Sequence, residues 1–287
     1  MAYSGLNLGN VKNQNRSSIL KLLNDHGPMP RKDLSARLGL TPASLTTLCG
    51  ELLAQNILFE LGEVQQDKRA GRRKILLGIN YAYRHVLSIS IEAPATSVTL
   101  CDLRGEHCIT RRIPTDTSVE PELFLKRVAN VGKALLWENS IGREELLGAG
   151  VSVPGPVDRE KGVSTHAYRV WDQPVQVTAP LAEALECTVL LENNVKAFAQ
   201  AELIYGLGRT EENLLLLKWG PGVGSAIIAQ GRIYESRMYK SAEIGHVRVE
   251  KNGRLCRKYA SAFGKLSSDG SGSDRHNRRC VERQKRL

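Results

Sequence analysis

The stretch of residues 214–249, LLLLKWGPGVGSAIIAQGRIYESRMYKSAEIGHVRV, constrains this chain more than any other. Two apolar runs, Leu214 to Leu217 and Ala226 to Ala229, have the composition of buried strands. Glycines 220, 222 and 224 between them permit a tight turn and a close approach of the backbone to a ligand. The polar residues Glu243 and His246 follow within Glu-Ile-Gly-His. The whole pattern predicts a small-ligand site, whereas the glycines alone are equally compatible with a tight hairpin.

Charge is distributed unevenly along the 287 residues, whose net charge is +10. Residues 1–78 hold 11 Lys and Arg against 6 Asp and Glu, residues 257–287 hold 9 against 3, and residues 79–256 hold 20 against 21. A basic end suits nucleic acid, and a neutral middle suits a small ligand. The six cysteines are scattered, the chain opens without a signal-peptide pattern, and no apolar run approaches about 20 residues. We therefore expect a cytoplasmic protein without a membrane-spanning segment.

Residues 13–25, 30–38 and 41–55 carry the apolar spacing of three helices. Gly39 provides a turn before the third, where Thr41 and Pro42 suit the N-cap and first helical position. The inward residues of this helix are predicted to be Leu45, Leu48, Leu52 and Leu53. Its exposed front is then made of Thr41, Pro42, Ala43, Ser44, Thr46 and Thr47. This is the pattern of a helix-turn-helix, in which small side chains and hydroxyls suit the major groove. A three-helix bundle without a DNA role is the alternative.

Two predicted strands, at 57–61 and 74–79, flank a cationic loop that contains Lys68, Arg69, Arg72 and Arg73. A basic loop with a glycine can follow the phosphate backbone or enter the minor groove of DNA. A solvated linker is the alternative reading of such a charge run. Together with the preceding helices, the loop predicts a winged helix-turn-helix domain over residues 1–80 that binds double-stranded DNA.

Beyond residue 80, predicted strands alternate with predicted helices, which is typical of an α/β fold. We expect paired strands at 86–91 and 97–103, and further strands at 147–153 and 189–191. Helices are expected at 122–139, 180–186 and 196–204.

Two more segments, Gly148 to Asp158 (GAGVSVPGPVD) and Leu191 to Ala197 (LENNVKA), complete the pattern. With the stretch 214–249 and the N-terminal helices, they resemble the repressor branch of the ROK family, named for repressors, open reading frames and sugar kinases. The resemblance covers about residues 12–256. It implies an actin-like (ribonuclease H-like) two-lobed sugar kinase fold, with a first lobe over 81–195 and a partial second lobe over 196–256.

Residues 257–287 do not resemble the family. Their Ser, Gly and charge content indicates a disordered basic tail. Family members continue further, so the resemblance implies an incomplete second lobe, as would follow from a shifted reading frame or an engineered end.

The resemblance also indicates which kinase chemistry is missing. ROK kinases hold ATP phosphates and metal with an acidic residue followed by Gly-Gly-Thr, and those positions here fall on Ser90, Glu92, Ala93 and Pro94. Glu92 would repel phosphate, and the two residues after it prevent the close backbone approach that glycine allows. The aspartate that serves as general base is replaced by Asn194, whose amide does not take up a proton usefully at neutral pH. We therefore expect neither kinase activity nor a cofactor.

Sugar-binding groups are retained better. Asn193 corresponds to the asparagine that bonds sugar hydroxyls in the family, and Glu243 and His246 correspond to its ligand-binding pair. Asn194 can still bond a hydroxyl. Such a set suits a polyol, because each hydroxyl both donates and accepts; a satisfied core histidine is the alternative for His246.

The family also has a structural zinc, for which His246 and Cys256 correspond to two of four ligands. The other two cysteines are missing, so we expect no bound zinc.

These inferences predict a sugar-responsive transcriptional regulator, a repressor of carbohydrate metabolism genes. Its partners would be operator DNA, a monosaccharide effector and a second copy of the chain in a homodimer. The alternatives are a ROK-type sugar kinase with an added DNA-binding domain and a non-functional truncated fragment. Ser90 and Asn194 favour the regulator over the kinase.

Overall fold

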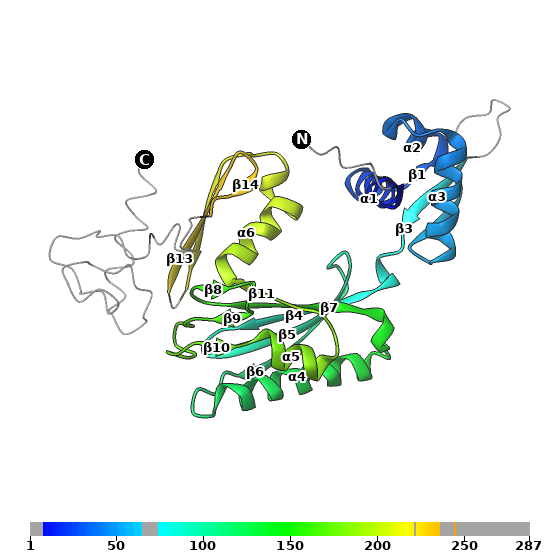
Figure 1. The fold of residues 1–287 in the computed structure, drawn as a ribbon. Coiled ribbons are helices and arrows are strands. Elements are labelled where there is room, and N and C mark those ends of the chain that lie inside the picture. The colour runs from blue at the N-terminus through cyan, green and yellow to red at the C-terminus, as the bar shows by residue number, and fades with distance from the viewer. Residues whose placement is uncertain (1–7, 65–73, 221, 236–243, 245–287) are drawn as a thin grey trace. The chain divides into compact units, whose positions relative to one another are not determined.

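The computed structural model of the protein describes residues 8–64, 74–220, 222–235 and 244. The chain divides into two compact units, Met1–His85 with Cys101–His107, and Val86–Leu100 with Cys108–Leu287. Figure 1 traces both units along the chain. Each unit has a hydrophobic core of its own.

The first unit combines helices with a small antiparallel sheet. Its helices are α1 (Leu8–His26), α2 (Arg31–Leu38) and α3 (Pro42–Ala54), and the turn η1 (Tyr81–Tyr83) follows them. The strands β1 (Met29–Pro30), β2 (Leu58–Val64) and β3 (Lys74–Ile79) lie in the order β1-β3-β2. Both strand pairs are antiparallel, so the two predicted strands beyond the helices do pair with each other.

Local sequence signals set the helix ends in this unit. Gly39 ends α2 in the left-handed region at φ 65°, and the side chain of Thr41 accepts a hydrogen bond from the Ser44 backbone N–H at the start of α3. The core contains the fully buried residues Ile19, Leu34, Leu45, Leu52 and Leu77. Leu53, predicted to face inward, is only partly buried at the edge of this core.

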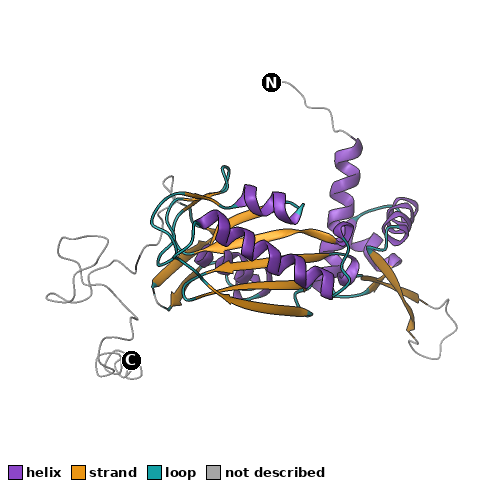
Figure 2. Cartoon of the chain, turned by 90° about the horizontal axis from the view of Figure 1, so that it is seen from below, coloured by secondary structure: helices purple, strands orange, loops and turns teal. Residues whose placement is uncertain are grey.

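The second unit is organised around a five-stranded sheet. Its strands are β4 (His85–Ile91), β5 (Ala95–Asp102), β6 (Cys108–Pro114), β7 (Leu146–Val153) and β11 (Val189–Asn193), in the order β11-β7-β4-β5-β6. Helices α4 (Pro121–Glu138) and α5 (Thr178–Leu185) cover one face, and the turn η2 (Arg143–Glu145) precedes β7. Figure 2 shows these helices laid across the strands. Strand β6 was not predicted, because its residues are largely exposed and lack apolar alternation.

Two further small sheets and one helix are formed by the parts of the chain that come after β7 and after β11. The short strands β8 (Val157–Asp158), β9 (Val163–Ser164) and β10 (Val175–Gln176) form one small sheet. Helix α6 (Asn194–Tyr205) and the turn η3 (Leu207–Arg209) lead to β12 (Leu214–Trp219), β13 (Val223–Ala229) and β14 (Arg232–Ile233), ordered β12-β13-β14. The predicted turn at Gln230-Gly231 has φ angles of 52° and 68°, as a tight hairpin requires.

The prediction that Leu214 to Leu217 is a buried strand is right about the strand but wrong about its burial. These residues do form β12, but Leu215 and Leu217 are 59% and 52% exposed, whereas Leu216 is buried. Alternate residues of a strand point to opposite faces, and α6 packs on only one face of this edge strand. Within the described ranges, no helix is long and apolar enough to cross a membrane.

Candidate functional site

The N-terminal turns of α3 carry the predicted base-reading residues. Thr41, Pro42, Ala43, Ser44, Thr46 and Thr47 are all exposed, while Leu45 among them and Leu48 after them are buried. The helical period therefore separates a small polar front from a packed back, as the sequence predicted.

The hydroxyls of this front already have hydrogen-bond partners. Thr46 Oγ1 donates to the Pro42 carbonyl at 2.7 Å, and Thr47 Oγ1 donates to the Ala43 carbonyl at 3.2 Å. Each oxygen keeps the capacity to accept a further hydrogen bond, and each hydroxyl can rotate to donate elsewhere. The predicted backbone contacts at Lys68, Arg69, Arg72 and Arg73 lie outside the described residues.

Asn193, predicted to bind sugar, holds two parts of the second unit together. Its Oδ1 accepts from the backbone N–H of Val195 and Lys196 at 2.9 and 3.1 Å, which caps α6. Its Nδ2 donates to the Gly155 carbonyl at 2.8 Å. The oxygen is thereby saturated, and one amide hydrogen remains for any ligand.

Gly155 lies beside Asn193 because β7 and β11 are neighbouring parallel strands whose carboxyl ends meet at one edge. Its φ is 101°, and a Cβ here would come within 2.4 Å of the His166 carbonyl oxygen. Only glycine fits this conformation and this gap. The Pro-Gly-Pro segment after β7 is thus shaped to bring its backbone to the end of β11.

Asn194 lies in a polar cluster that the sequence did not reveal. Its Nδ2 donates to Glu92 Oε1 at 2.9 Å, and the Lys218 ammonium group pairs with the same oxygen. A carboxylate only accepts, so this contact fixes the amide with Nδ2 toward Glu92 and Oδ1 away from it. The one sequence signal that could have indicated this contact is Lys218, a single lysine in the otherwise apolar strand β12.

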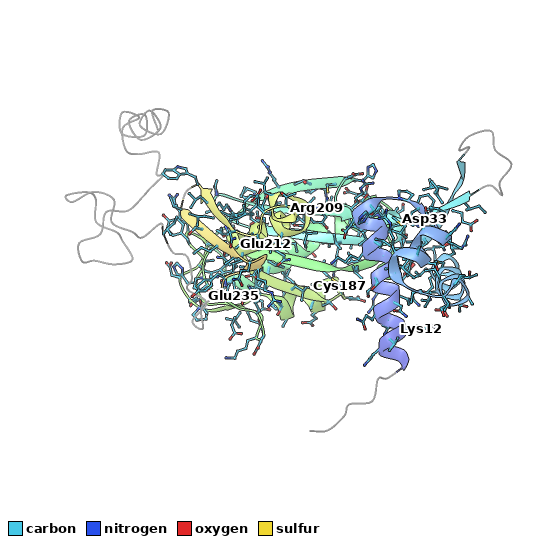
Figure 3. All side chains as sticks on the ribbon, turned by 90° about the horizontal axis from the view of Figure 1, so that it is seen from above. Lys12, Asp33, Cys187, Arg209, Glu212 and Glu235 are labelled. Carbon is cyan, nitrogen blue, oxygen red and sulfur yellow. The ribbon has the colours of Figure 1, made fainter. Side chains whose placement is uncertain are left out.

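A second charged network surrounds Arg159. Its Nε lies 2.5 Å from Glu192 Oε2 and its Nη2 lies 2.5 Å from Glu235 Oε1, while Lys196 Nζ approaches Glu235 at 3.7 Å. Partial burial alone would lower the pKa of the Arg159 guanidinium, but the two carboxylates outweigh it and raise the pKa. Glu235, labelled in Figure 3, follows β14, so this network joins it to the end of β11.

The glycine stretch has a packing role at one position. A Cβ on Gly224 would come within 2.5 Å of Val195 Cγ2, so glycine lets β13 approach the first turn of α6. Glu243, His246 and Cys256, the other predicted ligand residues, lie outside the described residues. The predicted ligand pair and zinc remnant therefore stay predictions.

Two surface hollows in the described part of the chain lie elsewhere. One, of about 780 Å³, is lined by residues around Arg143, Glu186 and Cys187; the other, of about 590 Å³, is lined by residues around Asp116 and Trp171. Neither is lined by a residue predicted to bind DNA or sugar. Both are open to solvent, so the arrangement of donors and acceptors at Asn193 and Asn194 is the better guide to a ligand site.

A model of the ROK family matches residues 86–257. The chain belongs to the ROK family. The predicted resemblance is thereby confirmed over more than half of the sequence, including the segments around Gly155, Asn193 and the glycine stretch.

The curated ROK relatives include transcriptional regulators. The chain is 24% identical to the xylose repressor of Bacillus spizizenii over 86% of its own length and 63% of that protein. It is 25% identical to the DNA-binding transcriptional dual regulator NagC of Escherichia coli over 91% of its own length and 63% of that protein. The chain thus spans somewhat less than two thirds of the length of these relatives.

Solved ROK structures share the fold. A ROK family transcriptional regulator, a homologue of the E. coli Mlc protein, matches 96% of this chain and 68% of its own with a TM-score of 0.73 and 23% identity. A ROK hexokinase from Thermus thermophilus matches 70% of this chain and 64% of its own with a TM-score of 0.53 and 22% identity. Regulators and kinases therefore share this mixed α/β architecture, and the fold alone does not separate them.

Proposed function

We propose that the protein is a sugar-responsive, DNA-binding transcriptional repressor whose ROK body binds a monosaccharide without phosphorylating it. The observation that carries the proposal is the similarity to ROK repressors along 86–91% of this chain, a share too large to leave out its N-terminal unit. Such a repressor would work in the cytoplasm, as a homodimer that binds symmetric half-sites.

The DNA half of the proposal rests on the first unit, which we take to be a winged helix-turn-helix. Helix α2 leads through the Gly39 turn into α3, whose front is small, polar and exposed. A front of this kind can enter the major groove, and the hydroxyls can bond bases or phosphates. The sequence between β2 and β3 supplies the cations for backbone contact.

The ligand half rests on the second unit. Asn193 and Asn194 lie at the carboxyl end of β11, beside the carboxyl end of its parallel neighbour β7. Ligands of open α/β sheets bind at such edges. With Glu243 and His246 as further contacts, the proposed ligand is a polyol, and the proposed consequence of binding is a change in DNA affinity.

The absence of phosphoryl transfer is part of the same proposal. A carboxylate base would have to stand at Asn194, and its amide is instead engaged by Glu92. A coupled ADP-release assay over common hexoses, pentoses and amino sugars should stay at background. Sugar-dependent turnover that disappears in Asn193→Ala would favour the kinase alternative.

DNA binding can be tested with an operator selected by the chain from random DNA. Arg72→Ala with Arg73→Ala should weaken binding to every sequence and reduce the slope of log K against log salt by about 2. Ser44→Ala or Thr47→Ala should change sequence preference instead. The control, Lys133→Ala with Arg143→Ala, removes the same charge from exposed positions of the second unit and should have little effect.

The effector is tested by measuring operator affinity with and without a panel of sugars. A coupling of about 1–3 kcal/mol would change DNA affinity roughly 5- to 150-fold. Glu243→Ala should abolish the change and leave DNA binding without sugar intact. Operator binding that no sugar alters would contradict the ligand half, and a chain that selects no DNA would contradict the DNA half.

A further inference from the structure

Three side chains that are far apart in the sequence meet at one carboxylate oxygen. Glu92 follows β4, Asn194 begins α6, and Lys218 lies on β12. Both the Asn194 amide and the Lys218 ammonium group contact Glu92 Oε1. The contacts span 102 and 126 residues, so the cluster ties the five-stranded sheet to α6 and the β12–β13 hairpin.

The cluster remains accessible to a small molecule. The side chains of Glu92 and Lys218 are 29% and 35% exposed, and Asn194 is partly exposed. Within the described residues, the second carboxylate oxygen of Glu92 has no hydrogen-bond partner. The Asn194 carbonyl points away from Glu92, and an ammonium group has three hydrogens, so groups remain that can bond hydroxyls.

The charges around Asn193 and Asn194 are balanced within the described contacts. Glu92 is matched by Lys218, and the carboxylates of Glu192 and Glu235 are matched by Arg159 and Lys196. A phosphate group that approached Lys218 would meet the Glu92 carboxylate and would have to displace it. A neutral hydroxyl could bond the same groups without separating the ion pair.

We propose that Glu92 determines the charge of the ligand that this site accepts. By holding Lys218 in an ion pair, it prevents the ammonium group from binding an anion, so that the site takes an uncharged sugar and rejects the phosphorylated form. Lys218 is then a latent phosphate-binding residue. Specificity of this kind comes from an unfavourable interaction with the wrong ligand rather than from an added contact with the right one. The inference rests on the proposed sugar-binding function.

The test is calorimetric titration of the full chain with glucose, xylose and N-acetylglucosamine, and with glucose 6-phosphate and N-acetylglucosamine 6-phosphate. The wild type should bind the responsive sugar at least about tenfold more tightly than its phosphate, since one unfavourable charge nearby is worth about that factor. Glu92→Gln keeps the shape and the hydrogen-bond acceptor but removes the charge. It should shift the ratio of the two affinities toward the phosphate by about tenfold or more.

Two further variants separate the local effect from a general change of charge. The double variant Glu92→Gln with Lys218→Met should lose the gained phosphate affinity, because the freed cation is gone. Glu138→Gln, at the end of α4, removes the carboxylate of an exposed ion pair with Arg111 of β6 and should leave the ratio unchanged. If Glu92→Gln fails to fold by circular dichroism, Lys218→Met alone serves, and should weaken binding of the phosphate further relative to the free sugar.

The inference is overturned if the wild type binds a sugar phosphate as tightly as the free sugar, or if the Glu92 charge does not affect the ratio. Sugar-dependent DNA binding would then still stand as the proposed function, with a phosphorylated effector. If neither class of sugar binds, both this inference and the ligand half of the proposed function fail, while DNA binding is judged by its own assay.

Discussion

Replacing Asn193 separates its structural role from its proposed role in sugar binding. Asn193→Ala removes two acceptor contacts with the first turn of α6 and one donor contact with the Gly155 carbonyl. Asn193→Asp keeps the acceptor and adds a charge that the helix N-terminus favours, but it removes the donor to Gly155. The two variants should therefore differ in stability, although both change the amide that would contact the ligand.

The magnitude follows from the contacts. Loss of an N-cap costs about 1 kcal/mol, and loss of the hydrogen bond to Gly155 costs about 1 kcal/mol more. We expect Asn193→Ala to lower the free energy of unfolding of the second unit by about 2 kcal/mol, and Asn193→Asp to lower it by about half as much. At a denaturant slope of about 2 kcal/mol per molar urea, the alanine variant should unfold at a midpoint about 1 M lower.

Tryptophan fluorescence is suited to the measurement, because all three tryptophans, Trp137, Trp171 and Trp219, belong to the second unit. A urea titration followed by this signal reports on that unit and not on the first. Gln176→Ala is the matched control: it removes one exposed side-chain amide that donates to the Lys161 carbonyl at 3.0 Å. Its effect should stay within about 0.5 kcal/mol.

The reasoning is refuted if Asn193→Ala unfolds at the wild-type midpoint. That result would mean that the cap and the contact with Gly155 contribute nothing measurable, and it would leave ligand binding as the main role of Asn193. Equal losses in the Ala and Asp variants would show that the donor contact, rather than the cap, carries the effect.

Three further predictions concern packing and reactivity. Leu77→Ala should destabilise the first unit by about 2–5 kcal/mol, because Leu77 is fully buried. Circular dichroism melting of the whole chain would detect this as a loss of helical signal at lower temperature. Gly162→Ala should lower the urea midpoint of the second unit, since its φ is 67° and a Cβ would lie 1.7 Å from Thr178 Oγ1; an unchanged midpoint would contradict the described turn. Burial raises the pKa of the Cys49 thiol, with a smaller opposing effect of Arg31, so less reactive thiolate is present at pH 8. Iodoacetamide followed by mass spectrometry should therefore label exposed Cys108 before Cys49.

The helices and most strands could be predicted from sequence because their signals are local. Thr41 caps α3 and Gln230-Gly231 turns the β13–β14 hairpin through preferences of one or two residues for particular backbone angles. Strand β6 escaped prediction because an edge strand need not alternate apolar and polar residues. Leu215 and Leu217 were wrongly predicted to be buried, since an apolar run does not state how many faces of a strand are covered.

The sequence by itself determined the family, through the order and spacing of short motifs, and it predicted which residues would recognise DNA or a sugar. Only the tertiary structure decided what those residues already contact. Asn193 is a helix cap as well as a candidate ligand residue, and Asn194 is held by Glu92, which pairs with Lys218. These partners come from strands and helices that are brought together by sheet order and crossover connections. Separations of 102 and 126 residues leave no periodic trace in the sequence, so the neighbours of a side chain at the sheet edge follow from the packing of whole elements.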